Sequence, residues 1–179
     1  MTDDWLQRTT LLLGNDAITR LRQSRILVVG VGGVGAYAAE MLVRAGIGHM
    51  TLIDSDNVST TNINRQLIAL QSTVGQPKVT ILSKRLLDIS PYLEIEARQC
   101  YLEADDTDDL LMQGYDFVVD AIDTIAPKTA LLAACVRHGI AVISSMGAGA
   151  RLDPSQIQYA DISKTYRCGL AKAVRTRLR

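Results

Sequence analysis

The clearest chemical pattern in this chain is a set of glycines at fixed spacing. The apolar run "RILVV" at residues 25–29 leads directly into Gly30, Gly32 and Gly35, which are spaced G-x-G-x-x-G. In a strand–turn–helix unit these glycines permit a tight turn, let the backbone approach a phosphate, and let helix and strand pack closely. Asp54 follows at the distance where a carboxylate accepts from ribose hydroxyls. The pattern predicts a nucleotide site, with glycines used only for packing as the alternative.

A group of cationic and amide side chains bears on which nucleotide binds. The segments "NVSTTNINRQ" and "VGQPK" contribute Asn62, Arg65, Gln66 and Lys78. If this loop folds back over the nucleotide, the four side chains gather near the carboxyl ends of the first strands. Arginine and lysine suit a triphosphate because they offset the charge of a leaving pyrophosphate. Taken singly, each basic residue also fits an exposed helix surface, but together they favour ATP over a nicotinamide dinucleotide.

The segment "DFVVDAID" ends in two carboxylates, Asp120 and Asp123, after a buried apolar run. The carboxyl ends of strands form the edge where open α/β sheets bind ligands. A carboxylate at this edge holds Mg²⁺ through one or two oxygens, together with phosphates. We therefore expect Asp123 to bind Mg²⁺, to cap the next helix, or to do both. For Asp120 we favour a structural role.

Strands and helices alternate along the chain, and this order positions the residues above. Apolar runs predict strands at 25–29, 49–54, 93–99, 116–123 and 140–145, with one more at 156–163. Between them, helical patterns cover 33–46, 76–90, 105–113 and 127–139, and the opening residues 3–24 predict one or two short helices broken at Gly14. The alternation predicts an α/β, Rossmann-like, doubly wound and mostly parallel sheet with helices on both faces. We expect residues 1–179 to form a single domain.

The composition excludes few functions, but it bears on the cellular compartment of the protein. Apolar residues make up 47% of the 179, and the 19 acidic and 19 basic residues balance, so no global field indicates nucleic acid or membrane. We expect no signal peptide and no membrane span. The cysteines Cys100, Cys135 and Cys168 include no C-x-x-C pair, which favours a reduced, cytoplasmic setting. Cys100 and Cys135 lie in strand and helix patterns and are predicted to be core residues.

Several motifs together resemble one enzyme superfamily. "GVGGVG", the downstream "D-x-D", "N-x-N-R-Q", "VGQPK" and "DAID" look like the ubiquitin-activating-enzyme-like adenylating superfamily of the ThiF, MoeB and HesA type. The resemblance covers roughly residues 4–165. Within the superfamily, "STTNINRQ", "DAIDTIAPKTAL" and "GAGARLDPSQIQYADISKT" look most like the tRNA threonylcarbamoyladenosine dehydratases. These use ATP to close the threonylcarbamoyl side chain of a modified adenosine in tRNA into a ring.

The resemblance implies a role for each matching residue. The residues that would line the nucleotide are Gly30, Gly32, Gly33 and Gly35, with Asp54 on the ribose and Asp56 supporting the loop. The residues that would contact phosphates are Asn62, Arg65, Gln66 and Lys78. Asp123 would stand at the reacting α-phosphate and hold Mg²⁺. We therefore expect Asp123, Arg65 and Lys78 to be catalytic.

Arg8 is the remaining match. In the superfamily an N-terminal arginine enters the ATP site of the partner subunit, so the resemblance implies a homodimer with composite sites and a catalytic Arg8. An ordinary exposed position on a short helix is the alternative for this residue. A sulfur-transfer protein is a further partner that the resemblance suggests.

Two departures from the superfamily pattern matter. Carrier-protein adenylating enzymes hold zinc with two C-x-x-C pairs, but in "KTYRCGL" Thr165 stands where the first cysteine of a pair would be. One thiol cannot make a four-ligand site, which favours the tRNA enzymes; Cys168 is then a packing residue or, as the alternative, a nucleophile. The family also continues well past Arg179, so we expect a chain truncated at the C-terminus, ending within a helix.

The C-terminal residues are strongly basic. No acid follows Asp161, whereas six basic residues do: Lys164, Arg167, Lys172, Arg175, Arg177 and Arg179. Such a helix could attract tRNA phosphates or be an ordinary solvated face. The sequence as a whole predicts ATP-dependent adenylation of a carboxylate, most consistently the dehydration of threonylcarbamoyladenosine in tRNA. The alternatives are a sulfur-carrier adenylyltransferase, a dinucleotide oxidoreductase, and a non-catalytic nucleotide-binding module.

Overall fold

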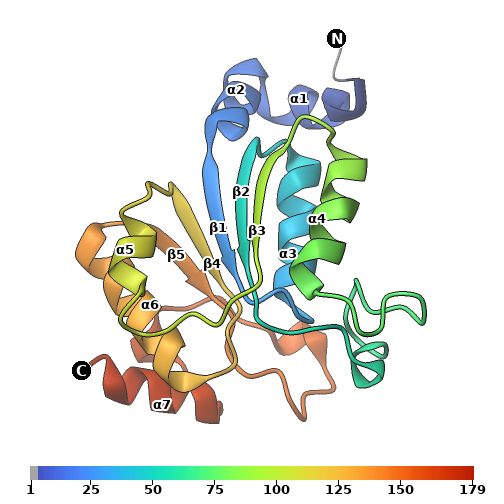
Figure 1. The fold of residues 1–179 in the computed structure, drawn as a ribbon. Coiled ribbons are helices and arrows are strands. Elements are labelled where there is room, and N and C mark those ends of the chain that lie inside the picture. The colour runs from blue at the N-terminus through green and yellow to red at the C-terminus, as the bar shows by residue number, and fades with distance from the viewer. Residues whose placement is uncertain (1–3) are drawn as a thin grey trace.

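The fold is built on one sheet of five parallel strands in the order β3-β2-β1-β4-β5 (Figure 1). The computed structural model describes residues 4–179. The strands are β1 (Arg25–Val29), β2 (His49–Ile53), β3 (Glu94–Arg98), β4 (Phe117–Asp120) and β5 (Ala141–Ser144). The chain moves outward from β1 through β2 to β3, and then returns to the other side of β1 for β4 and β5. This reversal between β1 and β4 is the kind of position at which open α/β sheets bind ligands.

Helices cover both faces of the sheet, as predicted. On one face lie α3 (Gly35–Ala45) and α4 (Lys78–Ile89), and on the other lie α5 (Thr107–Leu111) and α6 (Ile125–His138) (Figure 1). The central strand supplies both cores, because Ile26 and Val28 pack in the α3/α4 cluster while Leu27 and Val29 pack in the α5/α6 cluster. A strand buried on both faces is typical of a parallel α/β sheet. The predicted Rossmann-like class is therefore confirmed.

The two ends of the sheet differ in what they carry. At the amino ends of the strands lie η1 (Asp4–Leu6), α1 (Gln7–Leu13) and α2 (Asn15–Gln23), with Gly14 as the predicted break. At the carboxyl ends lie the turn into α3, a long loop containing η2 (Thr60–Asn62), and the segment after β5 (Figure 1). That last segment contains η3 (Pro154–Gln156), η4 (Ile162–Lys164) and α7 (Gly169–Arg177).

Two sequence predictions about the fold are wrong. Residues 156–163 form no strand, because Asp161 accepts the N–H of Ser163 and starts a 3-10 turn there, which is typical turn chemistry for aspartate and serine. Cys100 is exposed rather than part of the core, since β3 already ends at Arg98. The last helix, α7, runs to Arg177, with Leu178 at its C-cap. Among residues 4–179, no helix is both long and apolar enough to cross a bilayer.

Candidate functional site

The turn between β1 and α3 can be made only by glycine at two positions. Gly30 has a φ of +85°, and a Cβ there would lie 2.7 Å from the carbonyl oxygen of Ala121. A Cβ on Gly35 would lie 1.8 Å from the carbonyl oxygen of Gly30. The first glycine therefore makes the turn, and the second lets α3 start against it. This geometry leaves the backbone at residues 31–34 at the carboxyl edge of the sheet.

The ends of the three central strands are level with one another. Val29 is in register with Ile53 of β2 and with Asp120 of β4. Asp54, the next residue after β2, fastens the glycine turn because its Oδ2 accepts the N–H of Val31 at 2.8 Å. Its Oδ1 accepts the N–H of Asp56 at 2.8 Å. Asp54 thus has a structural role that the sequence did not reveal, although a carboxylate with two such bonds retains lone pairs for ribose hydroxyls.

The polar loop after β2 folds back on itself. Asn57 and Pro77 form an isolated antiparallel bridge, and the N–H of Lys78 donates to the carbonyl oxygen of Asp56 at 3.0 Å. Lys78 Nζ then reaches Asp56 Oδ2 at 2.7 Å. The lysine side chain is only 6% exposed, whereas that of Asp56 is 63% exposed. The loop therefore carries an ion pair with a sheltered cation and an open carboxylate.

Arg65 and Gln66 lie against the glycine turn. A Cβ on Gly32 would lie 3.5 Å from Gln66 Nε2, and a Cβ on Gly33 would lie 3.8 Å from Arg65 Cγ. Arg65 is exposed, and its Nη1 donates to the carbonyl oxygen of Thr61 at 2.9 Å. A guanidinium has five N–H donors, so others remain for a ligand. The cationic segment and the phosphate-type turn, separate in sequence, are neighbours in space.

Gln66 gives a test of whether a nucleotide suits this place. The residue is buried, and its Oε1 has no hydrogen-bond partner among the described residues. Leaving such a group unpaired costs about 1–3 kcal/mol. A ribose hydroxyl, or a water ordered by bound phosphates, would supply the missing donor. The unpaired oxygen belongs to a buried side chain that lies against Gly32, and it therefore fits a bound nucleotide.

Asn62 has a local task as well. Its Oδ1 accepts the N–H of Ser59 at 3.0 Å, which completes a capping box around η2. This contact holds the loop that presents Arg65. The predicted phosphate contact would have to come from the amide group of the same half-buried side chain.

Asp120, at the end of β4, is part of a buried network. Its Oδ2 lies 2.8 Å from Lys128 Nζ, and both side chains are 0% exposed. The same oxygen accepts the hydroxyl of Ser144 at 2.6 Å, while Oδ1 accepts the N–H of Ile122 at 3.0 Å. Lys128 Nζ also donates to the carbonyl oxygen of Ile122 at 2.9 Å. Asp120 is structural, as favoured from the sequence, and it fixes the backbone that leads to Asp123.

Asp123 occupies the opposite environment. The side chain is exposed, and the N-cap position of α6 belongs to Thr124, which makes no side-chain cap bond. The prediction that Asp123 caps the helix is therefore wrong. The preceding residues border the glycine turn, since a Cβ on Gly30 would lie 3.2 Å from the backbone nitrogen of Ile122. Asp123 is thus an open carboxylate beside the turn.

Lys128 was not identified from the sequence as a buried partner of Asp120, although the position of the lysine on a helix face indicates it. On a helix, positions three and four apart share one face, and Lys128 shares its face with Ile125, Leu131 and Leu132. Leu131 and Leu132 are buried. A lysine in the apolar face of a helix needs a buried acid, and Asp120 was the nearest candidate. No comparable sequence pattern predicts the hydrogen bond from Ser144 to Asp120.

Arg8 lies far from the glycine turn of its own chain. It is exposed on α1, at the amino ends of the strands, whereas the turn is at their carboxyl ends (Figure 1). One copy of the chain therefore cannot bring Arg8 to its own site.

The cysteines differ in environment, and none has a disulfide partner. Burial raises the pKa of the Cys135 thiol to about 11. For Cys168, burial raises the pKa, but N–H groups including those of Ala171 and Gly147 outweigh it and lower the pKa of this thiol. Its Sγ accepts these two N–H groups at 3.4 and 3.3 Å and caps α7. Among the described residues no group of three or more His, Cys, Asp or Glu side chains could hold a metal.

Comparisons with known proteins agree with this geometry. The chain is 46% identical over 172 residues to the tRNA threonylcarbamoyladenosine dehydratase of Bacillus subtilis, covering 96% of this chain and 68% of that protein. It is 35% identical over 155 residues to the molybdopterin-synthase adenylyltransferase of Escherichia coli, covering 86% of this chain and 61% of that one. A crystal structure of the Escherichia coli tRNA N6-threonylcarbamoyladenosine dehydratase, TcdA, in complex with ATP superposes with a TM-score of 0.95 at 42% identity.

That superposition covers 99% of this chain and 74% of the solved chain, so the chain spans roughly two thirds to three quarters of these dehydratases. The model of the ThiF family matches residues 6–179, from η1 to the last residue. The fold, the glycine turn and the position of the Arg65 segment are all found in the matched part. The chain therefore belongs to the ThiF family.

Proposed function

We propose that this protein uses ATP to adenylate a carboxylate, and that the carboxylate belongs to the threonylcarbamoyl group of a modified adenosine in tRNA. The observation that carries the proposal is the placement of Arg65 and Gln66 directly against the turn at Gly32 and Gly33. A dinucleotide oxidoreductase has no need of such a cationic segment. An enzyme that releases pyrophosphate does.

The chemistry explains why cations belong here. A carboxylate is a poor electrophile because it is anionic and lacks a good leaving group. Attack of its oxygen on the α-phosphorus of ATP forms an acyl-adenylate and releases pyrophosphate. Because two anions must approach each other, cations around the phosphates lower the barrier. An atom of the same side chain then attacks the acyl carbon and displaces AMP, which closes a ring with net loss of water.

The residues of the site divide this work between them. Arg65 would contact the phosphates from above the glycine turn, and Lys78 would do so by exchanging its contact with Asp56 for one with a phosphate oxygen. Asp123 fits a Mg²⁺ ligand of the kind that works with substrate phosphates rather than with a cage of protein ligands. The ion would offset phosphate charge during transfer.

A homodimer would supply Arg8. Exposed apolar side chains lie beside this residue, at Leu11 and Leu12, which are 81% and 82% exposed. A second exposed apolar stripe runs along α3 beside the glycine turn, at Val34, Tyr37 and Met41. Docking of α1 from one copy onto α3 of the other would bury both surfaces. It would also bring Arg8 to the glycine turn of the partner.

The relatives support tRNA as the substrate, since the protein of 46% identity is named for that reaction. The alternative is a sulfur-carrier adenylyltransferase, supported by the relative of 35% identity. Against it stands the lack of any C-x-x-C pair in the chain. A cytoplasmic location and a sulfur-transfer partner stay predictions.

Mass spectrometry of threonylcarbamoylated tRNA incubated with the protein and ATP tests the proposal. We expect the modified adenosine to lose one water, with pyrophosphate exchange into ATP that depends on the modified tRNA. In an Asp123→Ala variant exchange should stop while ATP binding stays measurable. Exchange that responds only to a small carrier protein would reverse the choice of substrate.

A further inference from the structure

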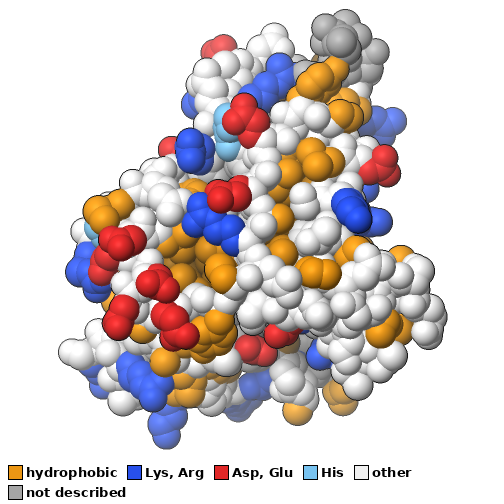
Figure 2. Space-filling model, viewed as in Figure 1, with side chains coloured by type: hydrophobic (Ala, Val, Ile, Leu, Met, Phe, Trp, Pro, Cys, Tyr) orange, Lys and Arg blue, Asp and Glu red, His pale blue; other side chains and the backbone are white. Residues whose placement is uncertain are grey.

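The neutral total charge of the chain conceals an uneven distribution. Residues 151–179 contain seven basic and two acidic residues, a net charge of +5, whereas residues 1–150 contain twelve basic and seventeen acidic residues, a net charge of −5. Figure 2 shows Lys and Arg side chains gathered at the lower margin, where α7 lies, below acidic side chains on the left. Charge asymmetry of this kind within one chain suggests an anionic partner for the basic part.

Most of these cations are free to meet a ligand. The exposed ones, which we call the basic surface, are Arg151, Lys164, Arg167, Lys172, Arg177 and Arg179. Within residues 4–179 no salt bridge includes any of them. Arg175 differs, because its Nη1 donates to the carbonyl oxygen and the hydroxyl of Thr165 at 2.9 and 2.6 Å. Arg175 is therefore structural, and it is left out of the basic surface.

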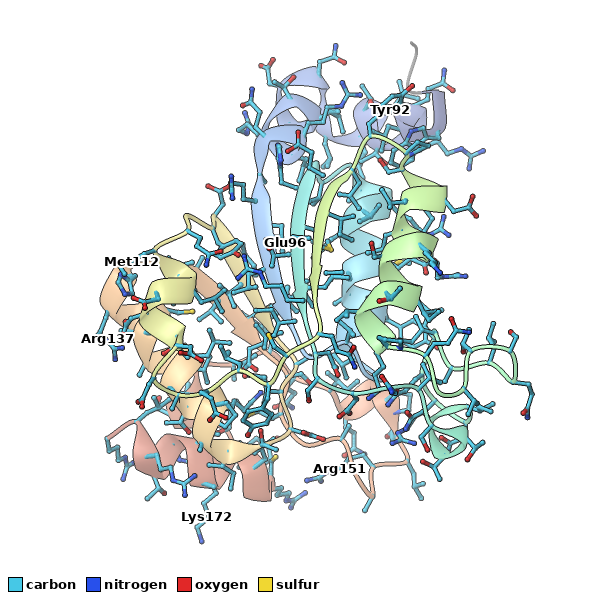
Figure 3. The ribbon with its side chains drawn as sticks, in the orientation of Figure 1. Tyr92, Glu96, Met112, Arg137, Arg151 and Lys172 are labelled. Carbon is cyan, nitrogen blue, oxygen red and sulfur yellow. The ribbon has the colours of Figure 1, made fainter. Side chains whose placement is uncertain are left out.

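The helix that carries the surface is held in place. Ala171 and Val174 are buried, and α7 packs on α6. In Figure 3, Lys172 points away from α7 into solvent, and Arg151 extends from the neighbouring loop toward the same side. The side chain of Arg151 also links that loop to the segment before α7, because one guanidinium nitrogen donates to the carbonyl oxygen of Arg167, while its other N–H groups remain for a ligand. The cations therefore project from a fixed support.

Contacts connect this support to the nucleotide site. Ala121 borders Gly30, as described above, and its neighbour Asp120 is in register with Ser144 at the end of β5. The loop that leaves Ser144 reaches Gly147, whose N–H donates to Cys168 Sγ at the start of α7. The amino-terminal end of α7 is thus held at the same edge of the sheet as the glycine turn.

We infer that the basic surface binds the phosphate backbone of tRNA and thereby holds the substrate while its modified nucleotide enters the site. The inference rests on the proposed function and names the surface through which the RNA docks. Exposed Lys and Arg side chains chiefly contact phosphates, which positions a nucleic acid without reading its bases. Exposed acids before and in α5, Glu103, Asp105, Asp106 and Asp109, repel phosphates and limit the surface on one side.

The test uses two double variants of equal net charge. Lys172→Gln with Arg177→Gln removes two cations from the basic surface, whereas Arg20→Gln with Lys84→Gln removes two exposed cations from α2 and α4. Binding of an unmodified tRNA transcript is measured at several KCl concentrations. We expect the first variant to bind about 10-fold more weakly, with a log–log salt dependence less steep by about two, because each phosphate contact contributes about one to the slope. The second variant should bind as the wild type does.

The outcomes separate this inference from the proposed function. Equal affinities and equal salt slopes in the two variants would overturn the docking surface, even if the wild type dehydrates modified tRNA. A second outcome is that the wild type dehydrates no tRNA while only the first variant loses transcript binding. That result would contradict the proposed dehydratase function and support the docking surface. Loss of binding to a small acidic carrier protein, with tRNA binding unchanged, would overturn the choice of RNA. In turnover, the first variant should raise the KM for tRNA and leave the kcat unchanged.

Discussion

Two lysine–aspartate pairs lie near the carboxyl edge of the sheet, and they differ in how much of each is sheltered. Lys78 and Asp56 meet at 2.7 Å, with the lysine 6% and the aspartate 63% exposed. Lys128 and Asp120 meet at 2.8 Å, and both are 0% exposed. Asp56 can give up the lysine of the first pair at low cost because water replaces it, provided that the sheltered lysine gains a phosphate in exchange. The second pair cannot separate in this way, because any separation leaves a charge in the core.

The comparison teaches that an ion pair of ordinary length says little about its role until the exposure of each partner is known. The half-open pair suits a lysine that must exchange its carboxylate for a phosphate. The closed pair suits a backbone that must not move, since Lys128 and Asp120 both bind Ile122, next to Asp123. Three substitutions can break or sharpen this contrast.

The largest effect is expected from Lys128→Met, which leaves Asp120 charged and buried. The free energy of unfolding should fall by about 3–5 kcal/mol, as when one partner of a buried pair is removed. Urea unfolding of the variant measures this. Lys84→Met, at an exposed position on α4, is the control and should stay within about 0.5 kcal/mol of the wild type. Adding Asp120→Asn to Lys128→Met should restore part of the lost stability. If Lys128→Met alone were as stable as the Lys84→Met control, the proposed difference between the two ion pairs would be wrong.

The next effect is expected from Lys78→Met, and it should fall on activity rather than stability. Loss of a cation at developing phosphate charge should lower kcat/KM for ATP by about 10²–10³-fold. The free energy of unfolding should change by less than about 1 kcal/mol, because Asp56 stays solvated. Steady-state kinetics and urea unfolding of the same preparation check both parts. A stability loss equal to that of Lys128→Met would mean that the two pairs are alike.

The smallest effect is expected at Glu40. In this ion pair the carboxylate is sheltered and the cations are exposed, whereas in the Lys78–Asp56 pair the cation is sheltered and the carboxylate is exposed. The Glu40 carboxylate is 7% exposed, and it binds Arg85 and Arg44, whose side chains are 45% and 49% exposed. The hydrogen bond from Arg85, opposed by burial and aided by Arg44, lowers the pKa of Glu40. A lowered pKa in the folded state stabilises the protein above the ordinary glutamate pKa, and this stabilisation is lost as pH falls through the folded value.

The stability difference between the wild type and Glu40→Gln should therefore be largest near neutral pH and should shrink on acidification. Urea unfolding at a series of pH values measures it. A difference that stays constant over that series would show that the ionised form of Glu40 is not its source.

The parts of the site that lie close in sequence, or at strand ends, were predictable. Gly30, Asp54 and Asp123 each follow an apolar run, and parallel strands bring their carboxyl ends to one edge. Arg65 and Lys78 could be placed there because the loop that carries them begins and ends at that edge. The fold class followed from the alternation of strands and helices.

Contacts that join three separate elements were not predictable. The Asp120 network needs Ser144 of β5 and Lys128 of α6 at the same point, and no local pattern reports such a meeting. The predictions of a buried Cys100 and of a strand at residues 156–163 were wrong for a different reason. The alternating apolar residues of both segments resemble a strand, but β3 already ends at Arg98. At residues 156–163 an aspartate–serine turn decides the backbone, and the exposed Tyr159 carries no burial to oppose it.

The Asp120 carboxylate also bears on how the molecule opens. It joins the end of β4 to Lys128 of α6 and to Ser144 of β5, the outermost strand on that side. The outermost strand of a sheet ordinarily unfolds locally by itself. Here, release of β5 would remove the Ser144 hydroxyl from the buried Asp120 carboxylate, which also binds Lys128 of α6. Backbone amides of the strand and the helix should therefore exchange with deuterium as one cooperative unit.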